Sequence, residues 1–188
     1  MTGEYMLRSQ MRTGAILQTA RLVLREMNDA DAPFILELLN DPAVLRYIGD
    51  KGVRTLDDAV EYMRTGPRAS YAQFGFGLWL VELEDGTAPI GICGLIKRPM
   101  LDDVDVGFAL LPRFRSGGYA FEAASAVIGY ARDTLCLRRL IAIANADNEP
   151  SGKLLEKLGM SFEKMVQPFP AEPALRLYGT TLDPAPSS

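Results

Sequence analysis

An Asp-Gly pair at positions 85 and 86 constrains the fold more than any other feature of this sequence. The stretches on either side, residues 76–84 and 89–96, have the apolar and β-branched composition of strands. Asp-Gly readily adopts the positive φ angles that a tight hairpin turn requires. We therefore predict an antiparallel hairpin, which excludes a fold built only from a parallel sheet.

The rest of the chain reads as strands and helices intermixed around one twisted sheet. We expect further strands at residues 21–25, 104–110, 139–144, 161–167 and 174–181. We expect helices at residues 29–39, 55–70, 119–131 and 150–158. The length of 188 residues suits one domain, which we place at residues 15–182, between a disordered segment at 1–14 and a frayed tail at 183–188.

The chain contains no histidine, which excludes Ser-His-Asp and Cys-His catalysis and His-ligated zinc. Any proton transfer must use carboxylates, hydroxyls, amines or water, and we expect no metal. Lys and Arg number 20 against 24 Asp and Glu, a net charge of −4. That balance does not favour a nucleic-acid-binding protein, although it leaves room for a local basic patch.

The two cysteines indicate a reducing compartment. Cys93 and Cys136 lie in apolar surroundings without a CxxC partner, so we expect both to be reduced and buried. Residues 1–18 lack the apolar run of a secretory signal, and no stretch approaches the ~18 apolar residues of a membrane span. We expect a cytoplasmic protein that does not insert into a membrane.

The segment 111–120 joins a strand to a helix and could hold a phosphate group. Gly117 and Gly118 allow the backbone to approach a ligand, and the first helical N–H groups are unpaired. Arg113 and Arg115 add positive charge. An ordinary glycine turn with solvated arginines remains the alternative, because short glycine-rich matches are common.

The spacing Arg115-x-x-Gly118-x-Ala120 resembles the pyrophosphate signature of the GCN5-related N-acetyltransferase (GNAT) superfamily. Other segments follow in the order seen in the branch typified by ribosomal-protein-alanine N-acetyltransferases, and the resemblance covers residues 19–181. These segments are residues 19–25, 40–42, 46–48, 78–81, 90–95, 105–108, 118–123, 148–151 and 155–159.

The resemblance implies a single α/β (α+β) domain of the GNAT type. Its sheet would be mixed and mostly antiparallel, with about six or seven strands flanked by about four helices, and would splay between the fourth and fifth strands. Acetyl-CoA would lie in the splay, paired with free backbone groups as an added strand would be. Its contacts would be Phe108, Ala109, Leu110, Arg113, Arg115, Ser116, Gly117, Gly118, Tyr119, Ala120, Asn148 and Ser151. Where the branch commonly has Trp-Gly-Lys-Gly, this chain has Arg-Ser-Gly-Gly at residues 115–118. We expect Arg115 to offset the missing lysine.

The resemblance implies an acetyltransferase in which Asp105 is the base, directly or through water. Asp105 stands where the branch has a Glu, and strand alternation places it opposite Val104 and Val106. A solvent-facing strand carboxylate is the alternative, and Asp103 is the reserve base.

Ser151 and Asn148 begin the helix at 150–158. The resemblance implies that the Ser151 hydroxyl donates a hydrogen bond to the departing thiolate and that Asn148 contacts the pantetheine. The residues alone equally suit a first-turn serine and a helix cap. A backbone N–H near Phe108 would hold the oxyanion.

The acceptor would be a primary amine, either a protein N-terminus or a small molecule, attacking directly in a ternary complex. Tyr47 and Trp79 are candidates to line its pocket, although strand aromatics more often belong to the core. A catalytically weak acyl-CoA-binding sensor is the alternative function. Similar proteins are often dimers, so a homodimer stays open.

Overall fold

The computed structural model describes residues 14–86, 88–169 and 173–183. Its strands are β1 (Ala15–Gln18), β2 (Leu22–Arg25), β3 (Leu78–Leu83), β4 (Pro89–Ile96), β5 (Asp105–Leu110), β6 (Arg139–Asn145), β7 (Ser161–Val166) and β8 (Leu175–Thr181). Its helices are α1 (Ala32–Leu39), α2 (Pro42–Tyr47), α3 (Leu56–Thr65), α4 (Pro67–Phe74), α5 (Tyr119–Asp133) and α6 (Glu149–Lys157). Short 3-10 turns, η1 (Asp29–Asp31) and η2 (Pro112–Phe114), precede α1 and α5.

In the described part of the chain the strands form one eight-stranded sheet in the order β1-β2-β3-β4-β5-β6-β8-β7. The predicted hairpin of β3 and β4 is confirmed, and Leu80 pairs with Ile92 across it. The sequence named seven strands, within the expected count of about six or seven, and the eighth is the four-residue β1, which pairs antiparallel with β2. All neighbouring pairs are antiparallel except β5 and β6.

β5 and β6, the fourth and fifth of the strands that the sequence predicted, splay apart as expected. Their pairing is parallel and is limited to Asp105 with Ile141. By contrast, β5 pairs with β4 over its whole length, and β6 pairs with β8 over its whole length. The sheet therefore consists of two well-paired parts, β1–β5 and β6–β8, joined at one point.

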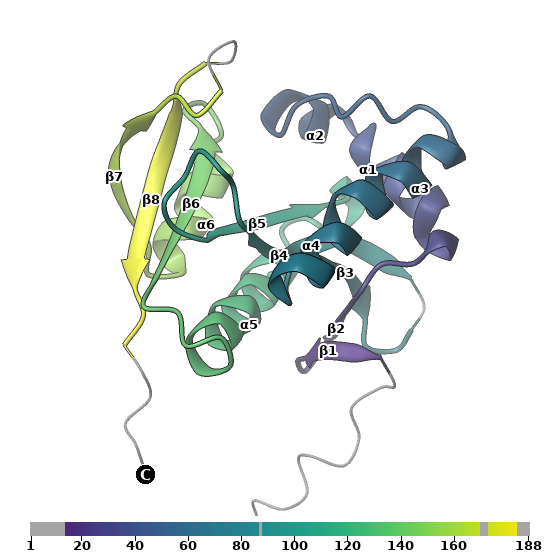
Figure 1. The fold of residues 1–188 in the computed structure, drawn as a ribbon, viewed down its shortest axis with the longest axis horizontal. Helices are drawn as coiled ribbons and strands as arrows, with labels where there is room; N and C mark the ends of the chain where they lie inside the picture. Colours follow the sequence, from purple (N-terminus) through teal and green to yellow (C-terminus); the bar gives the residue numbers. More distant parts are fainter. Residues whose placement is uncertain (1–13, 87, 170–172, 184–188) are drawn as a thin grey trace, which may run out of the picture.

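Different helices cover the two faces of the β1–β5 part (Figure 1). On one face, small residues of α5 such as Ala123 and Ala124 pack on Trp79 and Cys93. On the other face, α1 and α3 pack on a cluster that includes Leu80, Ile92 and Ala109. Consecutive residues of β5 thus point into different cores, and this alternation decides the surroundings of the candidate site residues.

The helices differ from the sequence prediction at two prolines. The Asn40-Asp41-Pro42 segment was interpreted only as the end of α1, but Asp41 also caps α2, whose first residue is Pro42. The helix expected over 55–70 is two helices, because α3 ends before Gly66 and Pro67 starts α4. Proline lacks an N–H but suits the first helical position, so it begins a new helix at both places. The described helices therefore exceed the four expected.

Other expectations had mixed outcomes. Cys93 is buried, but Cys136 is exposed, which corrects its assignment to the core. Residues 1–13 and 184–188 lie outside the described residues, so the expected disordered segment and frayed tail remain predictions. A search of the described helices finds none with the length and apolar character to cross a membrane.

Candidate functional site

The edge of β5 that faces the splay carries main-chain groups turned away from β4. On the β4 side, the N–H of Leu111 donates to the carbonyl of Ile90. On the β6 side, the carbonyl of Val104 accepts from the N–H of Ile141. Main-chain groups of successive strand residues alternate in direction. The N–H and C=O of Phe108 therefore point into the splay.

This alternation refines the predicted edge of residues 108–110. Ala109 pairs with Ile92, and its main-chain groups face β4, so it does not belong to the open edge. Leu110 does, and its carbonyl accepts a hydrogen bond of 2.9 Å from Arg115 Nε. Phe108 is thus the residue of β5 best placed to pair with an extended ligand.

Beyond β5, a glycine turn (residues 115–118) leads into α5. Ser116 and Gly118 have φ angles of 64° and 80°, in the left-handed region. Gly118 is the N-cap of α5, and no side chain caps the helix. The first-turn N–H groups, those of Tyr119 and Ala120 among them, thus lie at an uncapped helix start, which favours an anion.

The two arginines expected at this turn are both paired with carboxylates. Arg113 Nη1 lies 2.6 Å from Glu37 of α1. Arg115 Nη2 lies 2.6 Å from Asp41, the cap of α2. The prediction assigned both to the cofactor but did not foresee these partners.

Arg21 is a neighbour of the turn that the sequence did not reveal. Its Nη1 donates to the carbonyl of Gly117 at 3.0 Å, and its guanidinium lies over the Tyr119 ring at 4.4 Å. Its Nη2 lies 2.6 Å from Glu122, which also accepts from Thr19. Burial acts to raise the pKa of Glu122, but the bonds from Thr19 and Arg21 outweigh it and lower that pKa.

An open hollow of about 590 Å³ lies beside the glycine turn. Arg21, Gly118 and Phe121 line it together with Lys157, whose ammonium lies 4.7 Å from the Phe121 ring centre. Arg21, its partner Glu122 and Lys157 thus face a hollow next to an uncapped helix start, an arrangement whose cations and main-chain donors suit phosphate groups.

Asp105 lies at the junction of β5 and β6 and is only 2% exposed. It points away from Val106, as predicted, but it is buried, so the alternative of a solvent-facing carboxylate is wrong. Arg98 Nε donates to it at 2.7 Å. Burial raises the pKa of Asp105 to about 6, against the opposing effects of Arg98 and of a hydrogen bond from the backbone of Ile143.

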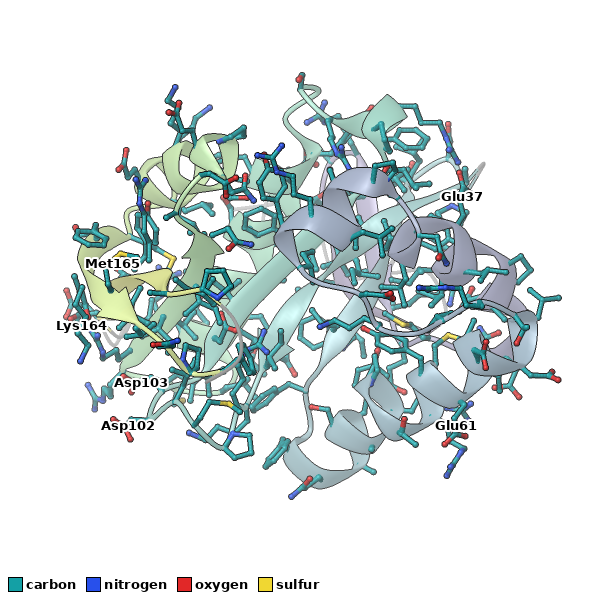
Figure 2. The ribbon with its side chains drawn as sticks, turned by 90° about the horizontal axis from the view of Figure 1, so that it is seen from above. Glu37, Glu61, Asp102, Asp103, Lys164 and Met165 are labelled. Atoms are coloured by element: carbon teal, nitrogen blue, oxygen red, sulfur yellow. The ribbon has the colours of Figure 1, made fainter. Side chains whose placement is uncertain are left out.

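Asp103, the reserve base, does not share this site. It precedes β5 and receives a 2.8 Å hydrogen bond from Arg139, which also binds Glu163. Figure 2 shows Asp103 at the outer edge of the molecule, near Lys164 of β7. Asp103 is therefore part of a surface ion pair.

Asn148 and Ser151 both lie at the start of α6. Asn148 is the N-cap, and its Oδ1 accepts from the N–H of Ser151 at 3.3 Å. The capping alternative is therefore confirmed for Asn148. Ser151 is half-buried in the first turn. Gly152 lies against Tyr178, so closely that an added Cβ would be 2.7 Å from the Tyr178 hydroxyl.

The two aromatic candidates for the acceptor pocket lie in different surroundings. Tyr47 is half-buried at the end of α2, with the Arg46 guanidinium 4.9 Å from its ring centre. Trp79 is 1% exposed and packs edge-on against Tyr130 of α5 at 5.4 Å. It belongs to the core on the face opposite Asp105, so Trp79 does not line an open acceptor pocket. Among the described residues, no three Cys, Asp or Glu side chains are grouped to hold a metal.

Comparison with known proteins gives this geometry a context. The family model "Acetyltransferase (GNAT) domain" matches residues 21–161. The Bacillus subtilis protein YoaA, described as an uncharacterized N-acetyltransferase, is 29% identical over 82% of this chain and 87% of its own length. A crystal structure of an acetyltransferase from Agrobacterium tumefaciens is 26% identical over 87% of this chain and 92% of that one, with a TM-score of 0.75.

A ribosomal-protein α-N-acetyltransferase, RimL, solved in complex with coenzyme A, superposes with a TM-score of 0.77. The match covers 90% of this chain and 98% of RimL at 15% identity, so this likeness concerns the fold alone. The family match, in contrast, spans the β5 edge, the glycine turn and α6. The chain is an N-acetyltransferase and belongs to the GNAT family.

Proposed function

We propose that the protein transfers an acetyl group from acetyl-CoA to a primary amine, which attacks directly within a ternary complex. The observation that carries this proposal is the juxtaposition of the open β5 edge at Phe108 with the uncapped start of α5. The first can pair with the amide groups of pantetheine, and the second can hold a diphosphate.

The residues present fit acetyl-CoA. Phe108 offers one N–H and one C=O to an extended chain, as a neighbouring strand would. The glycine turn supplies main-chain donors without a side chain in their way, and Arg21 neutralises Glu122 beside them. The hollow lined by Arg21 and Lys157 suits the phosphorylated adenosine end. RimL, which shares this fold, was solved in complex with coenzyme A, and this supports the same class of cofactor.

Asp105 is the proposed base and acts through water. Its carboxylate is buried, so an amine does not reach it directly. With a pKa of about 6, it is mostly ionised at pH 7 and can accept a proton. An α-amino group of pKa ~7.7 costs about 1 kcal/mol to deprotonate at pH 7, against about 4–5 kcal/mol for a lysine-like amine. A weak base therefore suits an α-amino acceptor better.

Ser151 is the proposed proton donor to the departing thiolate. It lies in the first turn of α6, where Asn148 holds its main-chain N–H. This leaves the hydroxyl as the polar group of Ser151 that is available to a ligand. Acetyl-CoA supplies the activated acetyl group; the chain's own part is to orient it and move protons at Asp105 and Ser151.

The acceptor is proposed to be a protein N-terminus or a small-molecule amine that enters beside Tyr47. Relatives by fold include a spermidine N-acetyltransferase in complex with CoA and spermine, and RimL. Both are less than 20% identical to this chain, so they show the breadth of acceptors within the fold. We also propose a cytoplasmic location.

A thiol-release assay with acetyl-CoA tests the proposal, using N-terminal peptides, amino sugars and polyamines as acceptors. We expect thiol release with at least one amine class. The sensor alternative has one supporting observation, the engagement of Asp105 by Arg98. CoA-dependent stabilisation in a melting assay, with no thiol released from any amine, would establish the sensor and reject the enzyme.

A further inference from the structure

The first turn of α2 is tied to the donor side of the site. Asp41, 8% exposed, accepts with Oδ1 from the N–H groups of Ala43 and Val44 at 3.1 and 3.3 Å. The same oxygen accepts from Arg115 Nη2 at 2.6 Å. Because Arg115 Nε also binds the carbonyl of Leu110, one guanidinium joins the cap of α2, the end of β5 and the glycine turn.

The last turn of α2 is tied to the other part of the sheet. Asn145, the last residue of β6, donates with Nδ2 to the carbonyl of Tyr47 at 2.9 Å. Arg46 pairs with Asp147 at 2.7 Å, although this exposed pair contributes little by itself. Asp147 directly precedes Asn148, so these contacts reach the turn that begins α6. In Figure 1, α2 lies on the side of α1 and α3 that faces β6 and β8.

The two ends of α2 differ in how much they depend on charge. Asp41 is nearly buried, so removal of its cation would leave an uncompensated carboxylate in the protein, which is costly. Lysine could not replace Arg115, because one ammonium cannot bind Asp41 and the Leu110 carbonyl in this fork geometry. Arg115 is 38% exposed, so its remaining N–H groups stay accessible to an anion at the glycine turn.

We propose that Arg115 and Asp41 are positioning residues that couple the donor site to α2, and through α2 to the acceptor side at Tyr47. This inference rests on the proposed function. An anion at the glycine turn orders the Arg115 guanidinium, which holds Asp41 and stiffens the N-cap of α2. By linkage, an acceptor held at Tyr47 tightens donor binding by the same factor.

Hydrogen exchange with the full-length protein tests this coupling without knowledge of the acceptor. The readout is the α2 ladder, in which Leu45 donates to Asp41 and Ile48 donates to Val44. CoA is the probe. We expect CoA to slow exchange over residues 42–49 at least about threefold in the wild type, because binding stabilises the ordered cap.

Asp41→Asn is the decisive variant, because asparagine caps a helix as well as aspartate does but removes the charge on Arg115's partner. We expect its Kd for CoA to stay within about threefold of the wild-type value, while CoA no longer slows hydrogen exchange over residues 42–49. Arg115→Lys is expected to lose the response as well. The control is Glu61→Gln, which removes the exposed ion pair with Arg64 on the outer side of α3 (Figure 2) and should leave the response intact.

The outcomes separate the two proposals. Failure of the wild type to bind CoA would overturn the proposed function and this inference with it. CoA binding with unchanged exchange over 42–49 would overturn the inference alone. A response that persists in Asp41→Asn would also overturn it, since the coupling would then not run through this ion pair.

Discussion

The buried carboxylate of Asp105 accepts a hydrogen bond of 2.7 Å from Arg98 Nε at the point where β5 and β6 separate. The two strands pair only there, where Asp105 lies beside Ile141 and the N–H of Ile141 binds the carbonyl of Val104. Arg98 therefore holds the proposed base at the joint between the two parts of the sheet, next to the opening.

The pH dependence of turnover tests the role of Asp105. Its pKa is raised to about 6, and only the deprotonated form accepts a proton, so, apart from the further rise near ~7.7 at which an α-amino acceptor loses its proton, wild-type turnover should rise with pH through about 6. Asp105→Asn should be at least ~10-fold slower at pH 7 and lack that transition. Initial rates of thiol release between pH 5 and 8 measure this. An unchanged midpoint in the variant would assign the base to another group.

Ser151→Ala should lower kcat by ~10-fold or more while the Kd for CoA stays within about twofold, because the hydroxyl acts on the leaving sulfur. Ser151→Thr retains a hydroxyl and serves as the control, with partial activity expected. Steady-state kinetics and calorimetric titration with CoA separate the two quantities. Unaltered turnover in Ser151→Ala would remove this residue from the mechanism.

Gly118→Val should weaken CoA binding by ~10-fold or more. The φ angle of 80° strains any residue with a Cβ, and the added atom would lie 3.4 Å from Arg21. Gly129→Ala, in the middle of the same helix, is the matched control, because no atom lies within 4 Å of its added Cβ. Equal affinities of Gly118→Val and the wild type would show that CoA does not use the glycine turn.

Arg21→Ala should raise the Kd for CoA by ~3- to 10-fold. The change frees the carbonyl of Gly117 and leaves Glu122 without its cation near the bound diphosphate. Combining it with Glu122→Gln should recover part of the loss, since the repelling charge is then absent. Arg132→Ala, which breaks an exposed pair with Asp133 at the far end of α5, should have no effect. No recovery in the double variant would argue against repulsion by Glu122.

Local patterns predicted much of the fold. The Asp85-Gly86 turn indicated the β3–β4 hairpin, and Thr55 with Asp58 indicated the capping box that begins α3. Both are decided by neighbours in the chain, where backbone angles and cap hydrogen bonds form. The start of α2 at Pro42 was missed because the same residues that end one helix can begin the next.

The resemblance to ribosomal-protein acetyltransferases, read from ordered motifs, predicted the family and the splay. It could not supply the neighbours of each motif. Arg21 lies 96 residues from Gly117 in the chain, and only the packing of β2 beside α5 brings them together. Arg115 belongs to the glycine turn, as the sequence indicated. Its partner Asp41, however, caps α2, a helix that the sequence did not reveal.

The sequence by itself determined which residues share a face of each strand, because side-chain alternation is a local property of the backbone. Trp79 and Asp105 were thus on definite faces from the outset. Only the tertiary structure decided what surrounds each side chain: α5 encloses Trp79 in the core, and Asp105 is buried beside Arg98 at the junction of β5 and β6. Burial, and with it the raised pKa of Asp105, depends on contacts between distant segments, which no local pattern encodes.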